Sequence, residues 1–306
     1  PYTTLFRSTT VFFSLDTTAV LLTPVVVVLA RYVGLSPLPF ALTTVWMANA
    51  GSLLLPVSNL TNLLAQHAMG DLAPAAFLAF MWAAALVAIV IPMAVVLLVS
   101  RRALAQRYEA GPVTTPRDTV LFWTVGTALV ALLPLLVSGL PVWMPATAAA
   151  AVIVIVYAVR RRSALRIALV PWPLLLLASG LFLFIAALHA AGLGSVLARV
   201  AGLGESPLAL LRLSLTATVS GNAINNLPAY LALEPVAGSP IRVAAVLIGV
   251  NVGPLIAPWA SLATLLWHQR LAALGVEVRW SRYVALGALV APVTVVAATL
   301  ALAATS

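Results

Sequence analysis

The sequence predicts an all-α polytopic membrane protein, and three observations lead to that fold class. Hydrophobic residues make up 63% of the 306 residues and charged residues only 8%, and the mean hydropathy is +1.13. About eight apolar stretches approach the roughly 20 residues that a helix needs to cross the hydrocarbon of a bilayer. A polar motif interrupted by Gly and Pro occurs twice inside these stretches. A soluble globular domain does not have this composition.

The charge and cysteine counts exclude several other classes of protein. The net charge of +9 comes from arginines between the apolar runs, a pattern of membrane topology that argues against a nucleic-acid-binding face. The chain has no cysteine, so disulfides, thiolate metal sites and thiol nucleophiles are excluded. His67, His189 and His268 share no metal-ligand spacing. We therefore expect a lipid bilayer as the surroundings, no nucleic-acid partner, no metal and no cofactor.

The first eight residues, Pro1–Ser8, resemble a translated sequencing adapter. They contain no initiator Met and no signal-peptide pattern, so we treat residues 1–8 as an artefact and leave them out of the fold. We expect the natural chain to begin further upstream, which makes the fold class N-terminally truncated.

The apolar runs place the helices in order along the chain. We expect a partial span at 9–33, spans at 38–66, 71–100, 118–140, 142–160 and 166–191, an interrupted region at 195–236, and spans at 240–267 and 283–305.

The arginines orient these spans. Loops 101–117 and 160–166 hold four arginines each and are separated by two spans, so they lie on one side of the membrane. The positive-inside rule makes that side cytoplasmic and predicts a multi-pass protein of the plasma (inner) membrane. Counting the spans from these loops puts Arg31, Arg270, Arg279 and Arg282 on the same side, and Arg199, Arg212 and Arg242 on or near the outer side. We divide the chain into the remainder of a first repeat at 9–100, a cytoplasmic linker at 101–117 and a second repeat at 118–306.

The repeat itself is visible without gaps. Residues 49–64, from Asn49 to Leu64, align on residues 251–266, with Asn, Gly, Leu and Pro at matching positions. Each copy puts Gly, Pro and polar side chains in the middle of a run that is otherwise apolar enough to span. Backbone groups freed at membrane depth must find partners in protein or in a water-filled cavity. Such paired interruptions predict broken helices that line a transported solute.

A second polar interruption precedes each copy: Ser14–Thr18, followed by Pro24, and Ser220–Pro228. We interpret both as re-entrant hairpins. If the interrupted region at 195–236 re-enters from the outer side, the two copies run in opposite directions, which predicts an inverted-repeat secondary transporter working by alternating access. The candidate substrate- and ion-binding residues are those of the two broken spans and the two hairpins: Asp16, Thr17, Thr18, Asn49, Ser58, Asn59, Asn62, Asn222, Asn225, Asn226, Asn251, Ser261 and Thr264.

Asp16 has a special place among these candidates because it is the one acid expected well inside a membrane-depth segment, where an ionisable group indicates function. We expect it to bind a proton or coupling cation; a helix-capping role is the alternative, and both roles are compatible. The asparagines suit a neutral polyol or an oxyanion. A single buried acid does not form a catalytic carboxylate cluster, so an intramembrane enzyme is the less favoured class and we expect no enzyme.

Gly253–Trp267, Pro56–Asn62, Asn225–Pro228 and the Asp16 hairpin resemble the arsenite/antimonite efflux permease family of the ion transporter superfamily, from about residue 9 to the C-terminus. The resemblance implies export of trivalent arsenic or antimony hydroxides in exchange for protons, alone or with a cytoplasmic arsenical ATPase, and fold relatives are often homodimers. The chain departs from the family at Leu15, where the family has Asn, and at Asn251, where it has an acid.

The same superfamily includes sodium- or proton-coupled carboxylate (citrate-like) transporters and sodium/proton antiporters, which are the alternative functions. A carboxylate importer needs positive potential at its hairpins. This chain offers amides and one aspartate there, which favours a neutral solute with a proton.

Overall fold

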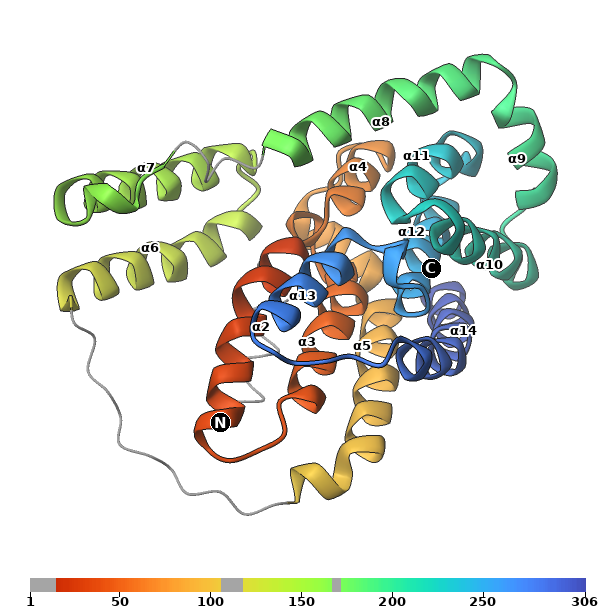
Figure 1. Ribbon diagram of the computed structural model, residues 1–306. Helices are drawn as coiled ribbons and strands as arrows, with labels where there is room; N and C mark the ends of the chain where they lie inside the picture. Colours follow the sequence, from red (N-terminus) through yellow and green to blue (C-terminus); the bar gives the residue numbers. More distant parts are fainter. Residues whose placement is uncertain (1–14, 106–117, 167–171) are drawn as a thin grey trace. The chain divides into compact units, whose positions relative to one another are not determined.

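The computed structural model describes residues 15–105, 118–166 and 172–306, and every regular element in these ranges is a helix (Figure 1). The expected artefact at residues 1–8, the first residue of the first hairpin (Ser14) and residues 106–117 of the linker lie outside the described residues. The chain forms two compact units. Unit 1 contains residues 1–72, 76–111 and 185–306, and unit 2 contains residues 73–75 and 112–184.

The elements follow one another in this order: α2 Leu15–Tyr32, α3 Leu38–Ala50, η1 Gly51–Leu54, η2 Pro56–Ser58, α4 Leu60–Ala68, α5 Pro74–Leu104, α6 Thr119–Val137, α7 Trp143–Arg160, η3 Arg162–Ala164, α8 Trp172–Ala190, α9 Leu193–Ala201, α10 Pro207–Ile224, α11 Asn226–Ala237, α12 Pro240–Val252, η5 Gly253–Leu255, η6 Pro258–Ala260, α13 Leu262–Ala273 and α14 Trp280–Thr305.

Four of the described helices are long and apolar enough to cross a bilayer by themselves: Pro74–Leu104, Thr119–Leu136, Trp143–Arg160 and Trp280–Thr305. A fifth candidate is the pair Ser179–Ala190 and Leu193–Ala201, which is bent by 84°. The spans expected at 38–66 and 240–267 are each a helix, two short 3₁₀ turns and a second helix. The predicted all-α polytopic fold with broken helices is therefore confirmed.

Unit 2 contains α6 and α7, whose apolar side chains are mostly exposed, as expected for helices surrounded by lipid. Asp118 caps α6 by accepting from the Leu121 backbone N–H at 3.0 Å, and Arg160 Nε donates to both Asp118 carboxylate oxygens at 3.0 and 2.9 Å. Arg160 and the cap hydrogen bond hold the pKa of Asp118 below its ordinary value. This ion pair ties the start of α6 to the end of α7.

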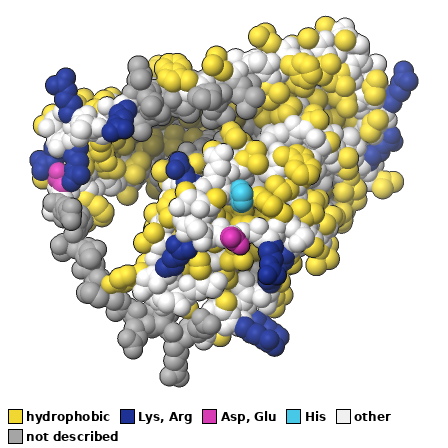
Figure 2. Space-filling model, in the orientation of Figure 1, with side chains coloured by type: hydrophobic (Ala, Val, Ile, Leu, Met, Phe, Trp, Pro, Cys, Tyr) yellow, Lys and Arg dark blue, Asp and Glu magenta, His cyan; other side chains and the backbone are white. Residues whose placement is uncertain are grey.

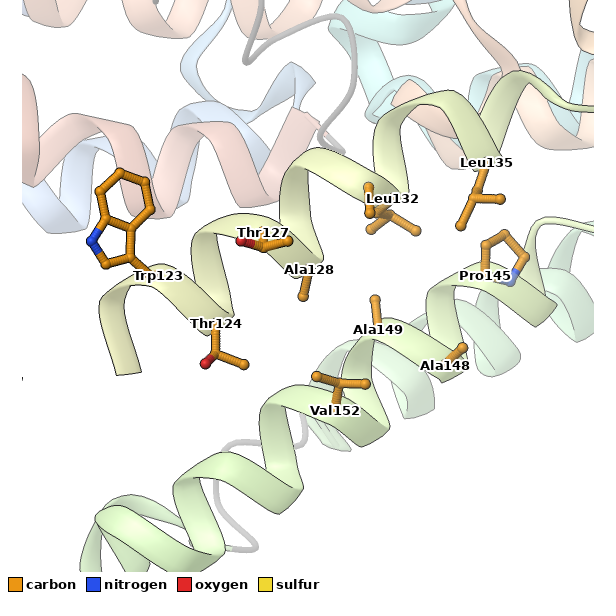
Figure 3. Close-up of a pocket in the computed structure, with 11 residues that line it drawn as sticks. Trp123, Thr124, Thr127, Ala128, Leu132, Leu135, Pro145, Ala148, Ala149 and Val152 are labelled. Atoms are coloured by element: carbon orange, nitrogen blue, oxygen red, sulfur yellow. The ribbon is translucent and has the colours of Figure 1, made fainter. Parts of the chain in front are cut away.

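A pocket of about 520 Å³ lies between α6 and α7 (Figure 3). In that view Thr124 and Val152 come from the two helices and face one another across it. Its lining is apolar except for Thr124 and Thr127, so it offers no charged group to a solute.

Unit 1 is built around α12, which is buried at every position from Arg242 to Val252. A helix that is apolar on all sides belongs in the interior of a bundle. Gly249 lets the backbone of α10 come into direct contact, because a Cβ there would overlap the carbonyl oxygen of Ser214. A Cβ at Gly287 of α14 would likewise overlap the carbonyl oxygen of Leu255 in η5. Small residues thus bring α10 and α14 against the second broken helix.

The two halves of unit 1 contact each other reciprocally. Helix α13 packs on α2 and α3, and its repeat counterpart α4 packs on α11 and α12. The 3₁₀ turn η1 contacts α12, as η5 contacts α3. Figure 1 shows α12 and α13, in blue, beside α3 and α4, in red and orange. Reciprocal contacts of this kind are what a two-fold relation between repeated halves produces.

Candidate solute and ion site

The two breaks have the same backbone geometry. Leu55 and Asn59, which flank η2, are extended, with φ and ψ of −130° and 147°, and −151° and 147°. Their counterparts Ala257 and Ser261 have −94° and 137°, and −142° and 135°. A proline follows the first extended residue in both halves and cannot donate a backbone hydrogen bond. The sequence repeat is therefore also a repeat of local structure.

Asn62 satisfies the backbone freed at the first break. Its Nδ2 donates to the carbonyl oxygens of Ser52 at 2.6 Å and Leu55 at 3.1 Å. The Leu55 carbonyl also accepts from the Ser58 N–H at 3.2 Å, whereas the Ser52 carbonyl has Asn62 as its donor, and a buried carbonyl left unpaired costs about 1–3 kcal/mol. The donors of this candidate residue are used to hold the break open.

Asn222 of α10 performs the same task for the second break. Its Nδ2 donates to the Gly253 carbonyl at 2.9 Å, and its Oδ1 accepts from the Ala257 N–H at 3.0 Å. Asn225, with φ of +89°, ends α10 and donates from Nδ2 to the Trp259 carbonyl at 2.9 Å. The asparagines of the second hairpin thus support the second break.

Asn251 joins the two halves. Its Oδ1 accepts from Asn59 Nδ2 at 2.8 Å and from Thr61 Oγ1 at 3.1 Å, and its Nδ2 donates to Asn62 Oδ1 at 2.8 Å. All four side chains are buried. An asparagine of the second half therefore completes the polar cluster of the first, which we call the amide bridge (Asn59, Thr61, Asn62 and Asn251).

The counterpart of the amide bridge in the other half is not bonded in this way. Asn49, equivalent to Asn251, turns its Nδ2 back to the Val45 carbonyl of its own helix at 2.9 Å. Asn49 Oδ1, Ser261 Oγ and Thr18 Oγ1 are buried and have no hydrogen-bond partner among the described residues. These three residues lie in or cap three helices that contact one another pairwise, α3, α13 and α2, and we call them the open cluster. The side chain of Ser261 is shorter than that of its equivalent Asn59, and Ala263 has no hydroxyl where Thr61 has one. The side chains at these two positions therefore extend less far and carry fewer hydrogen-bond donors.

The remaining candidates are placed as follows. Ser58 and Thr264 are fully buried, in η2 and in the first turn of α13. Asn226 is buried at the start of α11, and its Oδ1 accepts from the Leu227 N–H at 2.9 Å. Asp16 and Thr17 lie in the first turn of α2, but their side chains are outside the described residues. The structure thus unites Asn59, Asn62 and Asn251 in direct contact.

Thr61 belongs to the amide bridge, although the sequence candidates do not include it. The signal was present, since Thr61 lies within the repeated motif, but its equivalent is Ala263 and a comparison of the copies therefore discounts it.

One arginine is buried among the described residues, and its donors are already used. Arg242 donates to the carbonyl oxygens of Ala237 at 2.6 Å, Gly204 at 2.7 Å and Gly202 at 2.7 Å. It closes the ends of α9 and α11. Nor do the described residues contain a group of three or more His, Asp or Glu that could hold a metal.

Two interlocked broken helices within a bundle of apolar helices define a polytopic membrane transporter. Residues 4–264 match the citrate transporter family, CitMHS. The chain is 31% identical over 298 residues to the arsenical pump membrane proteins of Escherichia coli (strain K12) and Shigella flexneri, covering 89% of this chain and 68% of each relative. It is 30% identical to that of Yersinia enterocolitica over the same length. The chain therefore belongs to the arsenical pump membrane protein family of the ion transporter superfamily. No solved structure matches it significantly.

Proposed function

We propose that this protein exports arsenite and antimonite across the plasma membrane by proton antiport, and that the solute binds at the open cluster. The observation that carries the proposal is the contrast between the halves. Asn251 is bonded on both amide atoms, whereas Asn49 Oδ1 and Ser261 Oγ are buried without partners among the described residues. A buried polar atom left unpaired calls for a partner such as water, an ion or a ligand.

The chemistry of the open cluster suits a neutral hydroxide. Asn49 Oδ1 is an acceptor, and the hydroxyls of Ser261 and Thr18 can both accept and donate. Trivalent arsenic and antimony hydroxides carry several O–H donors and no charge at neutral pH. They therefore match acceptors in a site that has no compensating charge. The relatives named arsenical pump membrane protein support this solute.

For the coupling proton we propose Asp16. It lies in the first turn of α2, two residues from Thr18, and α2 packs directly on α13 and α3. An ionisable group in such a segment is expensive unless it has a function. Protonation of Asp16 from outside and release inside would drive solute in the opposite direction. A cytoplasmic arsenical ATPase and a second copy of the chain are further partners that we propose from the family resemblance.

A coupled carboxylate transporter is the second candidate, and the match to the citrate transporter family favours it. A carboxylate requires positive potential. Among the described residues the one buried arginine is Arg242, and its guanidinium group donates to three backbone carbonyls. This observation favours the neutral solute.

The test is arsenite uptake into inside-out membrane vesicles that carry the protein expressed from its complete gene, with and without a proton gradient. Citrate and sodium serve as parallel solutes. We expect gradient-dependent arsenite accumulation in the wild type and its loss in Asp16→Asn, at unchanged protein level. Movement of citrate or sodium without arsenite would assign the protein to the second candidate. Normal gradient-driven uptake by Asp16→Asn would remove the proton role of Asp16.

A further inference from the structure

A pocket of about 390 Å³ lies in unit 1, apart from the two breaks. It forms where the start of α3, the end of α5 and the segment that leads from α13 into α14 come together. Its volume is in the range of small-molecule sites. These helix ends join segments that the arginine pattern places on the cytoplasmic side, so the pocket belongs to the inner membrane interface.

Three arginines line this pocket without a partner. Arg102, Arg279 and Arg282 are exposed, and none makes a side-chain hydrogen bond or ion pair with any described residue. Glu277 is the one acid in the lining, so the pocket has a net positive charge. On the face shown in Figure 2, arginine side chains (dark blue) stand out from a surface that mixes yellow apolar groups with white ones. Unpaired guanidinium groups attract phosphate, which they bind in a bidentate manner.

Two helix N-termini add to this positive potential. Helix α3 begins at Leu38 and helix α14 at Trp280, and neither start has a capping side chain. Both starts border the pocket, whose lining includes Leu38, Arg279 and Arg282. Free backbone N–H groups at a helix start favour an anion. The polar end of the pocket therefore combines two kinds of phosphate-binding group.

Apart from Ser36 and Ser100, the rest of the lining is mainly apolar or aromatic. Leu38, Leu42, Val99 and Leu286 form a wall, and the rings of Trp267 and Tyr283 are almost completely buried. A wall of this kind provides no interaction for a free phosphate ion, but it matches the start of an acyl chain. Basic pockets between membrane helices on the cytoplasmic side bind anionic headgroups.

We propose that this pocket binds an anionic phospholipid of the inner leaflet. Its phosphate lies against Arg102, Arg279 and Arg282, and one acyl chain runs along the wall formed by Leu38, Leu42, Val99 and Leu286. The lipid joins α3, α5 and α14, which belong to both halves of the repeat. It is distinct from the transported solute, and the site does not depend on the proposed function.

The test is thermal unfolding of the purified full chain in detergent, titrated with phosphatidylglycerol, phosphatidylcholine or inorganic phosphate. We expect phosphatidylglycerol alone to raise the Tm. The triple variant R102Q/R279Q/R282Q should need roughly tenfold or more phosphatidylglycerol for the same effect, because each arginine contributes to attraction by an anionic surface. The matched control R101Q/R161Q/R270Q removes the same charge from exposed arginines that do not line the pocket, and should respond as the wild type does.

Two further variants keep the test decisive if the triple variant folds poorly. Leu286→Trp fills the apolar wall and should reduce the response to phosphatidylglycerol, while Arg282→Lys keeps the charge and should retain most of it. An equal response of wild type and triple variant would overturn the proposal. So would equal effects of phosphatidylcholine and phosphatidylglycerol. Stabilisation by inorganic phosphate that Leu286→Trp does not alter would identify a free-anion site instead of a lipid site.

Discussion

Two asparagines at equivalent positions of the repeat have different surroundings. Asn251 accepts from Asn59 and Thr61 and donates to Asn62, so both atoms of its amide are used within the protein. The side chain of Asn49 makes one hydrogen bond, to a carbonyl of its own helix, and its Oδ1 has no partner among the described residues. The same residue type therefore joins the two halves at one position and, within the described part of the chain, has an unpaired amide oxygen at the other.

We predict that Asn251→Ala and Asn49→Ala separate stability from transport. Asn251→Ala removes three hydrogen bonds of the amide bridge. Such side-chain hydrogen bonds average about 0.6 kcal/mol each in a membrane protein, so the free energy of unfolding should fall by about 2 kcal/mol. Asn49→Ala removes a single bond to a nearby carbonyl and should change the unfolding free energy by less than about 1 kcal/mol while abolishing arsenite transport. Unfolding in mixed micelles and vesicle uptake measure the two effects.

The result that contradicts this prediction is a loss of stability in Asn49→Ala as large as that in Asn251→Ala. It would mean that Asn49 is also a structural residue. Normal arsenite uptake by a stable Asn49→Ala protein would exclude Asn49 from the solute site.

At the residue scale the sequence identified which polar side chains lie at the breaks but not what they bind. Asn62 and Asn222 are candidates because of their type and position, yet their donors go to the carbonyls of Ser52, Leu55 and Gly253. The direction of an amide group at a break depends on the non-helical φ and ψ of its neighbours. A residue pattern does not contain that information.

At the scale of elements, the breaks follow from local chemistry. Pro56 and Pro258 lack an N–H, and the residues that precede them, Leu55 and Ala257, are extended, as a residue before proline usually is. This is why the sequence predicts both broken spans well. The span expected to end at residue 191 ends with α8 at Ala190, and the chain then bends by 84° at the left-handed Gly192 into α9; the angle of such a bend is not contained in the residue pattern.

We predict that Gly287→Ala displaces the second break. A methyl group at Gly287 would overlap the carbonyl oxygen of Leu255, so η5 and α14 must move apart. The expected result is a lower Tm and reduced transport, with a destabilisation of about 1–3 kcal/mol for an overpacked contact. Thermal unfolding and vesicle uptake measure both effects.

Gly126→Ala is the matched control. Gly126 lies in the helical span α6 and a Cβ there meets nothing within 4 Å, so alanine should be neutral or slightly stabilising. Equal Tm values for Gly287→Ala and the wild type would show that α14 does not pack tightly on the break.

At the scale of the whole molecule, the arginine pattern and the repeat carried most of the information. Arg31 Nη2 lies 3.4 Å from the carbonyl of Gly275, and Arg102, Arg279 and Arg282 line one pocket. These are residues that the positive-inside rule places together on the cytoplasmic side. The arginines expected near the outer side include Arg212 and Arg242, and both donate to backbone carbonyls at helix ends. Charge counting cannot distinguish such structural arginines from topological ones.

The amide bridge also has a consequence for how the protein is made. Its hydrogen bonds join residues 189 to 192 positions apart, and translation at about 5–20 residues per second takes roughly 10–40 s to cover that distance. During this interval the first broken helix is outside the ribosome, while Asn59, Thr61 and Asn62 still lack their partner.

A single cysteine at Thr61, in a chain that has none of its own, should react with a water-soluble maleimide in arrested nascent chains ending near residue 240. It should be protected once residue 251 has entered the membrane. Protection already present in the shorter chains would contradict this order of events. Because the polar centre of the first half closes only when the second half arrives, we expect a chain arrested between the halves to present Asn59, Thr61 and Asn62 without their partner.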